Sequence, residues 1–123
     1  MFDVDFRGIG CSGLVTFLAA SGLTKDNEGQ VGKLSAAQTI GPCDAEDIFY
    51  GVMGVVEELT GVLGLARDGF HEVPYTGTVA AGRVELVADG DGGVKPPTTA
   101  GKGVYYNVVE VNSTDGLLTL DLG

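Results

Sequence analysis

The sequence contains no tryptophan, one histidine and two cysteines in 123 residues. His71 alone excludes a metal site built from several histidines, and no nucleophile motif lies near it that would make it a general base. Cys11 and Cys43 are far apart and form no CxxC motif. Because cytosolic disulfides are rare, we expect two partly buried free thiols, with a bridge between them as the alternative.

Positive charge is also scarce: the chain has 7 lysines and arginines but 17 aspartates and glutamates. Its formal net charge is -10. Such a chain repels a phosphate backbone and has no stripe of cations that would release counterions on binding. We therefore expect neither nucleic acid nor an anionic membrane surface as a partner.

The chain lacks a long apolar run. No stretch approaches the roughly 18 residues of a membrane span. The opening segment MFDVDFRGIG has neither the basic region nor the apolar stretch of a signal peptide. These features predict a soluble protein that is synthesised in the cytoplasm.

Motifs for phosphate or acyl chemistry are missing as well, because neither GxxxxGK[ST] nor GxSxG occurs. Gly8-Ile9-Gly10 begins like a dinucleotide fingerprint, but no βαβ pattern follows it. We expect no enzyme and no cofactor.

Acidic residues cluster at three places, and each cluster has an ordinary interpretation. Asp44, Glu46 and Asp47, like the pair Glu57-Glu58, are typical of a solvated turn, although a cation site or an acid/base couple is the alternative. Asp89 begins the sequence DGDGG, which resembles the start of a calcium loop but continues into valine, lysine and two prolines instead of further oxygen ligands. We predict a turn there and no metal.

Glycine is abundant, with 21 residues, well above the average usage of about 7%. Apolar residues make up 44% of the chain, which is typical of a globular rather than a disordered protein. A chain of this length forms one domain and buries roughly two-thirds of the surface that its unfolded form exposes. Many short strands joined by turns are the expected result.

The longest apolar stretch, from Ile48 to Tyr75, is the expected core, but its period is ambiguous. One face of a helix would contain Val52, Val55, Val56, Leu59, Leu63 and Ala66. Three glycines would each cost a helix interior roughly 1 kcal/mol relative to alanine, which favours strands at about Ile48 to Glu57, Gly61 to Ala66 and Phe70 to Tyr75. Asp68-Gly69 is the stronger of the two turn signals between them and predicts a tight hairpin.

Seven further short strands follow from alternation and turn signals. They are expected at Leu14 to Ala20, Gln30 to Ser35, Thr39-Ile40, Arg83 to Ala88, Val94-Lys95, Val104 to Val111 and Leu117 to Leu122. The last two are predicted to form a hairpin, and the stretch from Pro96 to Gly101 a surface loop. One helical turn is expected after Pro42, where carboxylates favour a helix N-terminus. The predicted fold class is mainly β, a small barrel or sandwich of short antiparallel strands with at most one short helical turn.

The segment from Phe2 to Arg7 alternates in the period of a strand. One face carries Phe2, Val4 and Phe6, and the other carries Asp3, Asp5 and Arg7. Because glycines at 8, 10 and 13 separate it from the rest, it is either an ordinary first strand or an arm that adds to the sheet of another chain. We expect an N-terminal arm over residues 1–13 and a single β-barrel domain over residues 14–123.

The order of segments resembles the capsid decoration, or cement, proteins of tailed bacteriophages and prophages, and is similar to the lambda-type head decoration protein. The segments, in order, are FDVDFRGIGC, VTFLAASGLTKD, DIFYGVMGVV, FHEVPYTGT, RVELVADGDGGVK, YYNVVEV and LLTLDL. They cover nearly the whole chain. The stretch VEELTGVLGLARDGF departs from the family pattern, which has a shorter hairpin after GVV.

The resemblance implies a β-tulip-like barrel that forms homotrimers on the outer surface of the virion, at three-fold positions of the head. It also implies that the arm residues Phe2, Asp3, Val4, Asp5, Phe6 and Arg7 pair with the major capsid protein. The expected function is structural, namely head stabilisation, with synthesis in the cytoplasm of the bacterial host.

A carbohydrate- or protein-binding β-module of a phage fibre or cell surface is the alternative function. Tyrosine suits both glycan stacking and protein interfaces, and the chain has four, Tyr50, Tyr75, Tyr105 and Tyr106. Ordinary packing in a β-sheet is the other interpretation of these residues.

Overall fold

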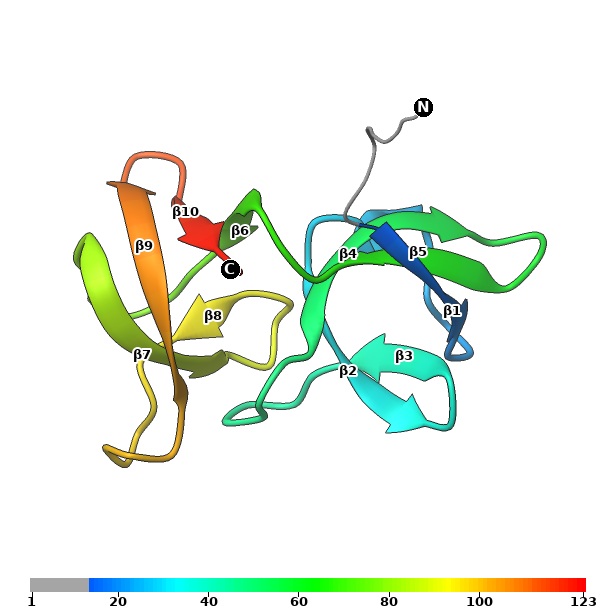
Figure 1. The fold of residues 1–123 in the computed structure, drawn as a ribbon, viewed down its shortest axis with the longest axis horizontal. Helices are drawn as coiled ribbons and strands as arrows, with labels where there is room; N and C mark the ends of the chain where they lie inside the picture. The colour runs from blue at the N-terminus through cyan, green and yellow to red at the C-terminus, as the bar shows by residue number, and fades with distance from the viewer. Residues whose placement is uncertain (1–13) are drawn as a thin grey trace.

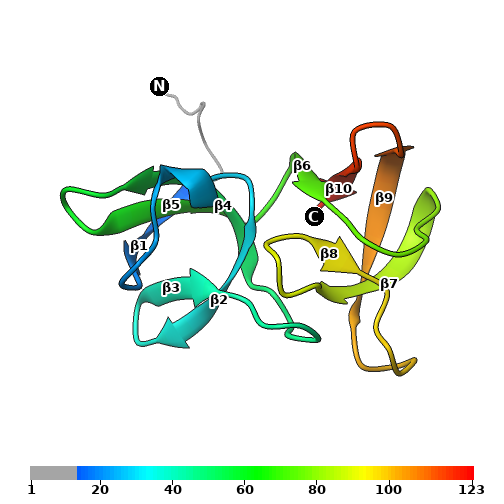
Figure 2. The ribbon, with the colours of Figure 1, turned by 180° about the vertical axis from the view of Figure 1, so that it is seen from behind.

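The computed structural model describes residues 14–123, which form two β units placed side by side (Figures 1 and 2). The first unit is a closed barrel in the order β1-β3-β2-β4-β5, and the second is a curled five-stranded sheet in the order β6-β10-β9-β7-β8. The predicted mainly β architecture is confirmed. The predicted strand from Phe2 to Arg7 lies outside the described residues.

The barrel strands are β1 (Leu14–Ala19), β2 (Val31–Ala36), β3 (Thr39–Pro42), β4 (Gly51–Glu57) and β5 (Val62–Ala66). The sheet strands are β6 (Phe70–Pro74), β7 (Gly82–Ala88), β8 (Val94–Lys95), β9 (Val104–Asn112) and β10 (Leu117–Asp121). Apart from the short parallel contact of β1 with β3, the ladders between these strands are antiparallel.

The apolar stretch around β4 and β5 is a hairpin, as its glycines predicted. Val52 pairs with Ala66 and Glu57 with Val62, and Gly61 closes the turn with a φ of 71°. Gly54 also makes room for β1, because a Cβ atom there would lie 2.8 Å from the side chain of Leu14. The glycines that rule out a helix therefore let β1 pack across this hairpin.

The predicted hairpin at Asp68-Gly69 is wrong. Gly69 has the expected positive φ of 84°, but β5 pairs with β4 and β1, whereas β6 pairs with β10. The positive φ of Gly69 produces the turn, but the turn leads the chain from the barrel into the sheet instead of back along β5. The N–H of Leu122 donates to the carbonyl of Gly69 at 2.9 Å, so the C-terminal residues hold this junction in place.

The helical turn predicted after Pro42 is also wrong. Residues 43–50 form a turn and loop in which Glu46 has a φ of 73°. The single short helix of the described residues is the 3-10 turn η1 (Lys25–Asn27), where Thr24 and Asn27 form a capping box. The acidic residues of the loop instead form salt bridges with lysines of neighbouring strands.

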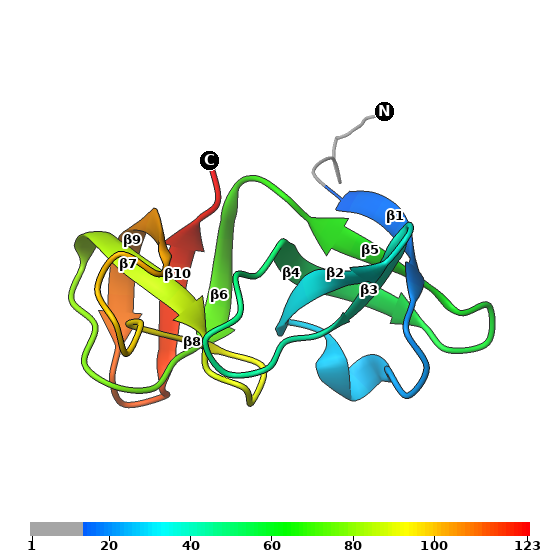
Figure 3. The ribbon, with the colours of Figure 1, turned by 90° about the horizontal axis from the view of Figure 1, so that it is seen from below.

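A common core joins the two units. Val31, Phe49 and Val52 of the barrel half pack in one buried cluster with residues of the sheet such as Val73 and Leu118. A second cluster, which includes Met53 and Leu65, fills the barrel interior. The barrel and the sheet are therefore packed against each other through apolar contacts. The view from below shows the two units next to each other (Figure 3).

Gly51 is a position where the packing between β4 and β5 leaves little room. A Cβ atom at Gly51 would lie 2.4 Å from the carbonyl oxygen of Ala66 and 2.9 Å from Cγ of Leu65. Because the conflict is with backbone, we expect Gly51→Ala to lower the free energy of unfolding by roughly 1–3 kcal/mol, as overpacking does. Chemical denaturation followed by circular dichroism measures this.

Gly64→Ala is the matched control, since its Cβ would meet only the side chain of Leu14, at 3.3 Å. We expect a clearly smaller loss of stability for Gly64→Ala. Equal losses for the two variants would contradict the tight contact between β4 and β5 at Gly51.

Candidate functional site

The six predicted arm residues, Phe2 to Arg7, lie outside the described residues, so the structure begins just after them at β1. β5 pairs with β1 from Leu14 to Leu18. On its other edge, β1 pairs with β3 only at Leu18 and Ala19. Within residues 14–123, the first part of β1 therefore has a strand on one edge only.

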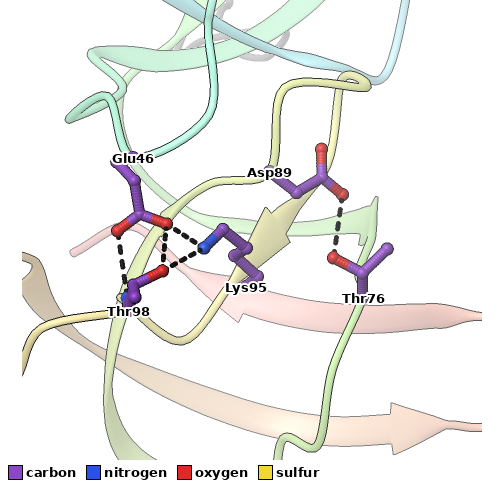
Figure 4. A network of polar contacts seen from close by, with 5 residues as sticks. All are labelled: Glu46, Thr76, Asp89, Lys95 and Thr98. Atoms are coloured by element: carbon purple, nitrogen blue, oxygen red, sulfur yellow. Dashed lines mark hydrogen bonds and ion pairs between the residues drawn. The ribbon is translucent and has the colours of Figure 1, made fainter.

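Polar side chains gather where the loop after β3 meets the sheet (Figure 4). The carboxylate of Glu46 accepts hydrogen bonds from the Lys95 ammonium, from the Thr98 hydroxyl at 2.9 Å and from the Thr98 backbone N–H at 3.0 Å. These donors, the lysine foremost, lower the pKa of Glu46 to about 2. The network ties the barrel half of the chain to β8 and to the loop after it.

Backbone hydrogen bonds reinforce the same contact. The N–H of Glu46 donates to the carbonyl of Ala88 at 2.9 Å, and the N–H of Ala88 donates to the carbonyl of Asp47, also at 2.9 Å. Next to them, the ammonium of Lys33 donates to the carboxylate of Asp47 at 2.6 Å. This hydrogen bond raises the pKa of Lys33 and lowers that of Asp47. The acidic residues of this loop therefore bind lysines and backbone, as structural groups do.

The sequence DGDGG forms a turn, as predicted. One carboxylate oxygen of Asp89 accepts the N–H groups of Asp91 at 2.7 Å and Gly93 at 3.0 Å. Its other oxygen lies 3.4 Å from the Thr76 hydroxyl (Figure 4). Within the described part of the chain, no group of three or more histidine, cysteine, aspartate or glutamate side chains is arranged to hold a metal ion.

His71 contacts the protein backbone, and Cys43 is buried. Nε2 of His71 lies 2.9 Å from the carbonyl oxygen of Asp68. Cys43 is a free, buried thiol, as predicted, and burial raises its pKa to about 12. So high a pKa leaves almost no thiolate near neutrality, and the thiolate is the reactive form. Cys11 lies outside the described residues.

Three of the four tyrosines pack within the protein. The ring of Tyr106 stacks on Phe49 with centroids 5.1 Å apart, and Tyr50 meets Phe17 edge-on at 5.9 Å. Tyr75 is partly buried against the main core. Tyr105 alone of the four is largely exposed, at 55%.

A groove of about 570 Å³ runs along β7, and we call it the edge groove. Its lining is mostly apolar and comes from β7, from β9 and from two loops: Thr78, Val79, Ala80, Val84, Glu85, Leu86, Pro96, Pro97, Thr98, Ala100 and Tyr105. Sequence reasoning missed it, because it arises where β7 continues beyond the two residues of β8. The unusually short β8, followed at once by two prolines, was the signal that an edge of β7 stays open.

No family model matches the chain, and no curated protein matches it. Among residues 14–123, no helix is long and apolar enough to cross a membrane.

The Glu46 network predicts a dependence of stability on pH. The folded-state pKa of Glu46, about 2, lies below its ordinary value of 4.5. Its contribution to stability is therefore present above pH 4.5 and is lost as the pH falls toward 2. Glu46→Gln should flatten the fall in melting temperature over this range, as measured by thermal unfolding at a series of pH values.

Glu110→Gln is the matched control, because Glu110 is exposed on β9. This variant should keep the acid sensitivity of the parent protein. If Glu46→Gln and Glu110→Gln follow the same pH profile, the network does not contribute as described.

Proposed function

We propose that this chain is a capsid decoration, or cement, protein of a tailed bacteriophage or prophage, and that it binds the outer surface of the head. The observation that carries the proposal is the order of the sequence segments, which resembles that family along nearly the whole chain. The described segments fall in β1 and on the regions of β4, β6, β7–β8, β9 and β10. A mainly β fold with a closed barrel is compatible with the β-tulip-like barrel that the resemblance implies.

Attachment is assigned to the arm from Phe2 to Arg7. Its alternating pattern suits β-augmentation, in which main-chain hydrogen bonds supply affinity and alternate side chains supply specificity. A homotrimer would present three such arms, and their effective concentration would turn weak single contacts into firm binding to the major capsid protein. The function is mechanical stabilisation of the head, and the charge of -10 suits a hydrated outer surface.

Removal of Met1 to Gly10 tests the proposal. We expect the shortened protein to keep the melting temperature of the parent and to lose binding to expanded capsids, because the added strand is gone. Co-sedimentation with capsids measures the binding.

Asp3→Asn/Asp5→Asn/Arg7→Gln is the matched control, since it keeps Phe2, Val4 and Phe6 and should still bind. Normal decoration by the shortened protein would show that the arm is not the attachment device.

Tyr105 favours the alternative function, a carbohydrate- or protein-binding β-module. Its ring is exposed and lines the edge groove, which is the arrangement that glycan stacking needs. A signal on a glycan array that Tyr105→Ala removes, from a protein without affinity for capsids, would support this module over the cement protein.

A further inference from the structure

The edge groove is lined by residues of β7 and β9 and by the loops before β7 and after β8. β7 begins at the end of the sheet unit away from the barrel (Figures 1 and 3). Val84 and Leu86 share one face of β7, since they pair with Tyr106 and Val104 of β9, while Glu85 and its partner Tyr105 belong to the opposite face. Four of these six residues, Val84, Glu85, Leu86 and Tyr105, line the groove. Because both faces of one strand contribute, the groove follows the edge of β7.

That edge lacks a strand partner. β9 pairs with Gly82 to Leu86 on one side of β7, but β8 reaches only Val87 and Ala88 on the other. After β8 the chain continues as Pro96-Pro97, which have no N–H to donate to a ladder. Within residues 14–123, no backbone hydrogen bond from a loop reaches residues 82–86. An open edge of this kind is a template for an added strand.

The groove is preformed and continuous with the main core. Val79 and Val84 are partly buried against that core, and Leu86 is one of its buried members. The carboxylate of Glu85 accepts the N–H groups of Gly101 at 3.1 Å and Gly103 at 2.8 Å, which fixes the loop that forms the far wall. Apolar side chains placed here would extend the core and leave water.

An occupant must be extended, apolar on alternate residues and able to meet an exposed arginine. Arg83 is exposed and alternates with Val84, so it belongs to the face of β7 that carries Glu85. The segment from Phe2 to Arg7 has the required pattern, with apolar residues at 2, 4 and 6 and aspartates at 3 and 5. In an added strand, its apolar face would enter the groove and its aspartates would face Arg83.

We propose that the segment from Phe2 to Arg7 of one copy adds as a strand to the open edge of β7 in a second copy, with Phe2, Val4 and Phe6 in the edge groove. A second copy is favoured because β1, which follows the segment, lies in the barrel, whereas β7, which borders the groove, begins at the opposite end of the molecule (Figure 3). Residues 7–13 span at most about 25 Å when extended. This contact forms between copies in solution and does not depend on binding to a capsid, since one arm cannot pair with a second copy and with a capsid protein at the same time.

Self-association of the full-length chain, measured by sedimentation velocity over a range of concentrations, tests this proposal. The parent protein should show weight-average sedimentation coefficients that rise with concentration. In Ala80→Trp, a large side chain enters the groove from an exposed position. It should weaken association at least about tenfold, because at least one apolar side chain of the added strand can then no longer be buried. Phe2→Ser/Val4→Ser/Phe6→Ser should do the same.

Ala81→Trp is the matched control, because Ala81 is the exposed neighbour of Ala80 and does not line the groove. It should associate like the parent, and equal melting temperatures would show that all variants are folded. A parent protein that stays monomeric, or equal association of Ala80→Trp and Ala81→Trp, would overturn the proposal.

Cross-linking locates the contact. A photoreactive amino acid at position 4, in a mixture of isotopically light and heavy protein, should give cross-links to residues 79–84 that join a light peptide to a heavy one. Cross-links within one isotope only would assign the segment to its own chain, and cross-links that map to the barrel would assign it to another surface. Either result would overturn the proposal, while binding to capsids would still be tested separately by co-sedimentation.

Discussion

The seam between the barrel and the sheet is the constraint on which the rest of this structure depends. The barrel has a small core of its own, but the main buried cluster is shared, because it takes residues such as Val52 from the barrel and Leu118 from the sheet. The loop after β3 closes the seam with backbone bonds to Ala88 and with the Glu46 network. Apolar burial supplies the main driving force, while the polar contacts fix how the two units are oriented.

In this arrangement, acidic residues of the loop after β3 form ion pairs that hold the loop in place. In a chain with so few cations, two of its lysines, Lys33 and Lys95, are placed against the carboxylates of the loop after β3. The cluster of Asp44, Glu46 and Asp47 therefore contributes to holding the loop against the neighbouring strands. The surfaces that remain for recognition are apolar and lie elsewhere, at the edge groove and at the edge of β1.

Local patterns predicted the elements well and their connections less well. Glycine spacing separated β4 and β5 correctly, and DGDGG gave the turn between β7 and β8, because each depends on neighbouring residues only. The Asp68-Gly69 turn has the expected backbone but joins two units, since strand pairing is decided by the distant β10. The edge groove was equally hidden, because it depends on where β8 ends relative to β7. The arm, by contrast, was predicted from the alternation of apolar and polar residues at positions 2–7, and it stays a prediction.

The position of β10 has a consequence for how the protein is made. β10 lies between β6 and β9, and Leu122 bonds to the junction at Gly69. Until the ribosome has added β10, β6 lacks its strand partner, and the barrel residues of the shared cluster, such as Val52, lack Leu118 and Leu120 as neighbours. Pairing of β6 must therefore wait until Leu117 to Leu122 have left the exit tunnel, so the sheet unit is completed only after β10 emerges, whereas the ladders of the barrel do not need β10.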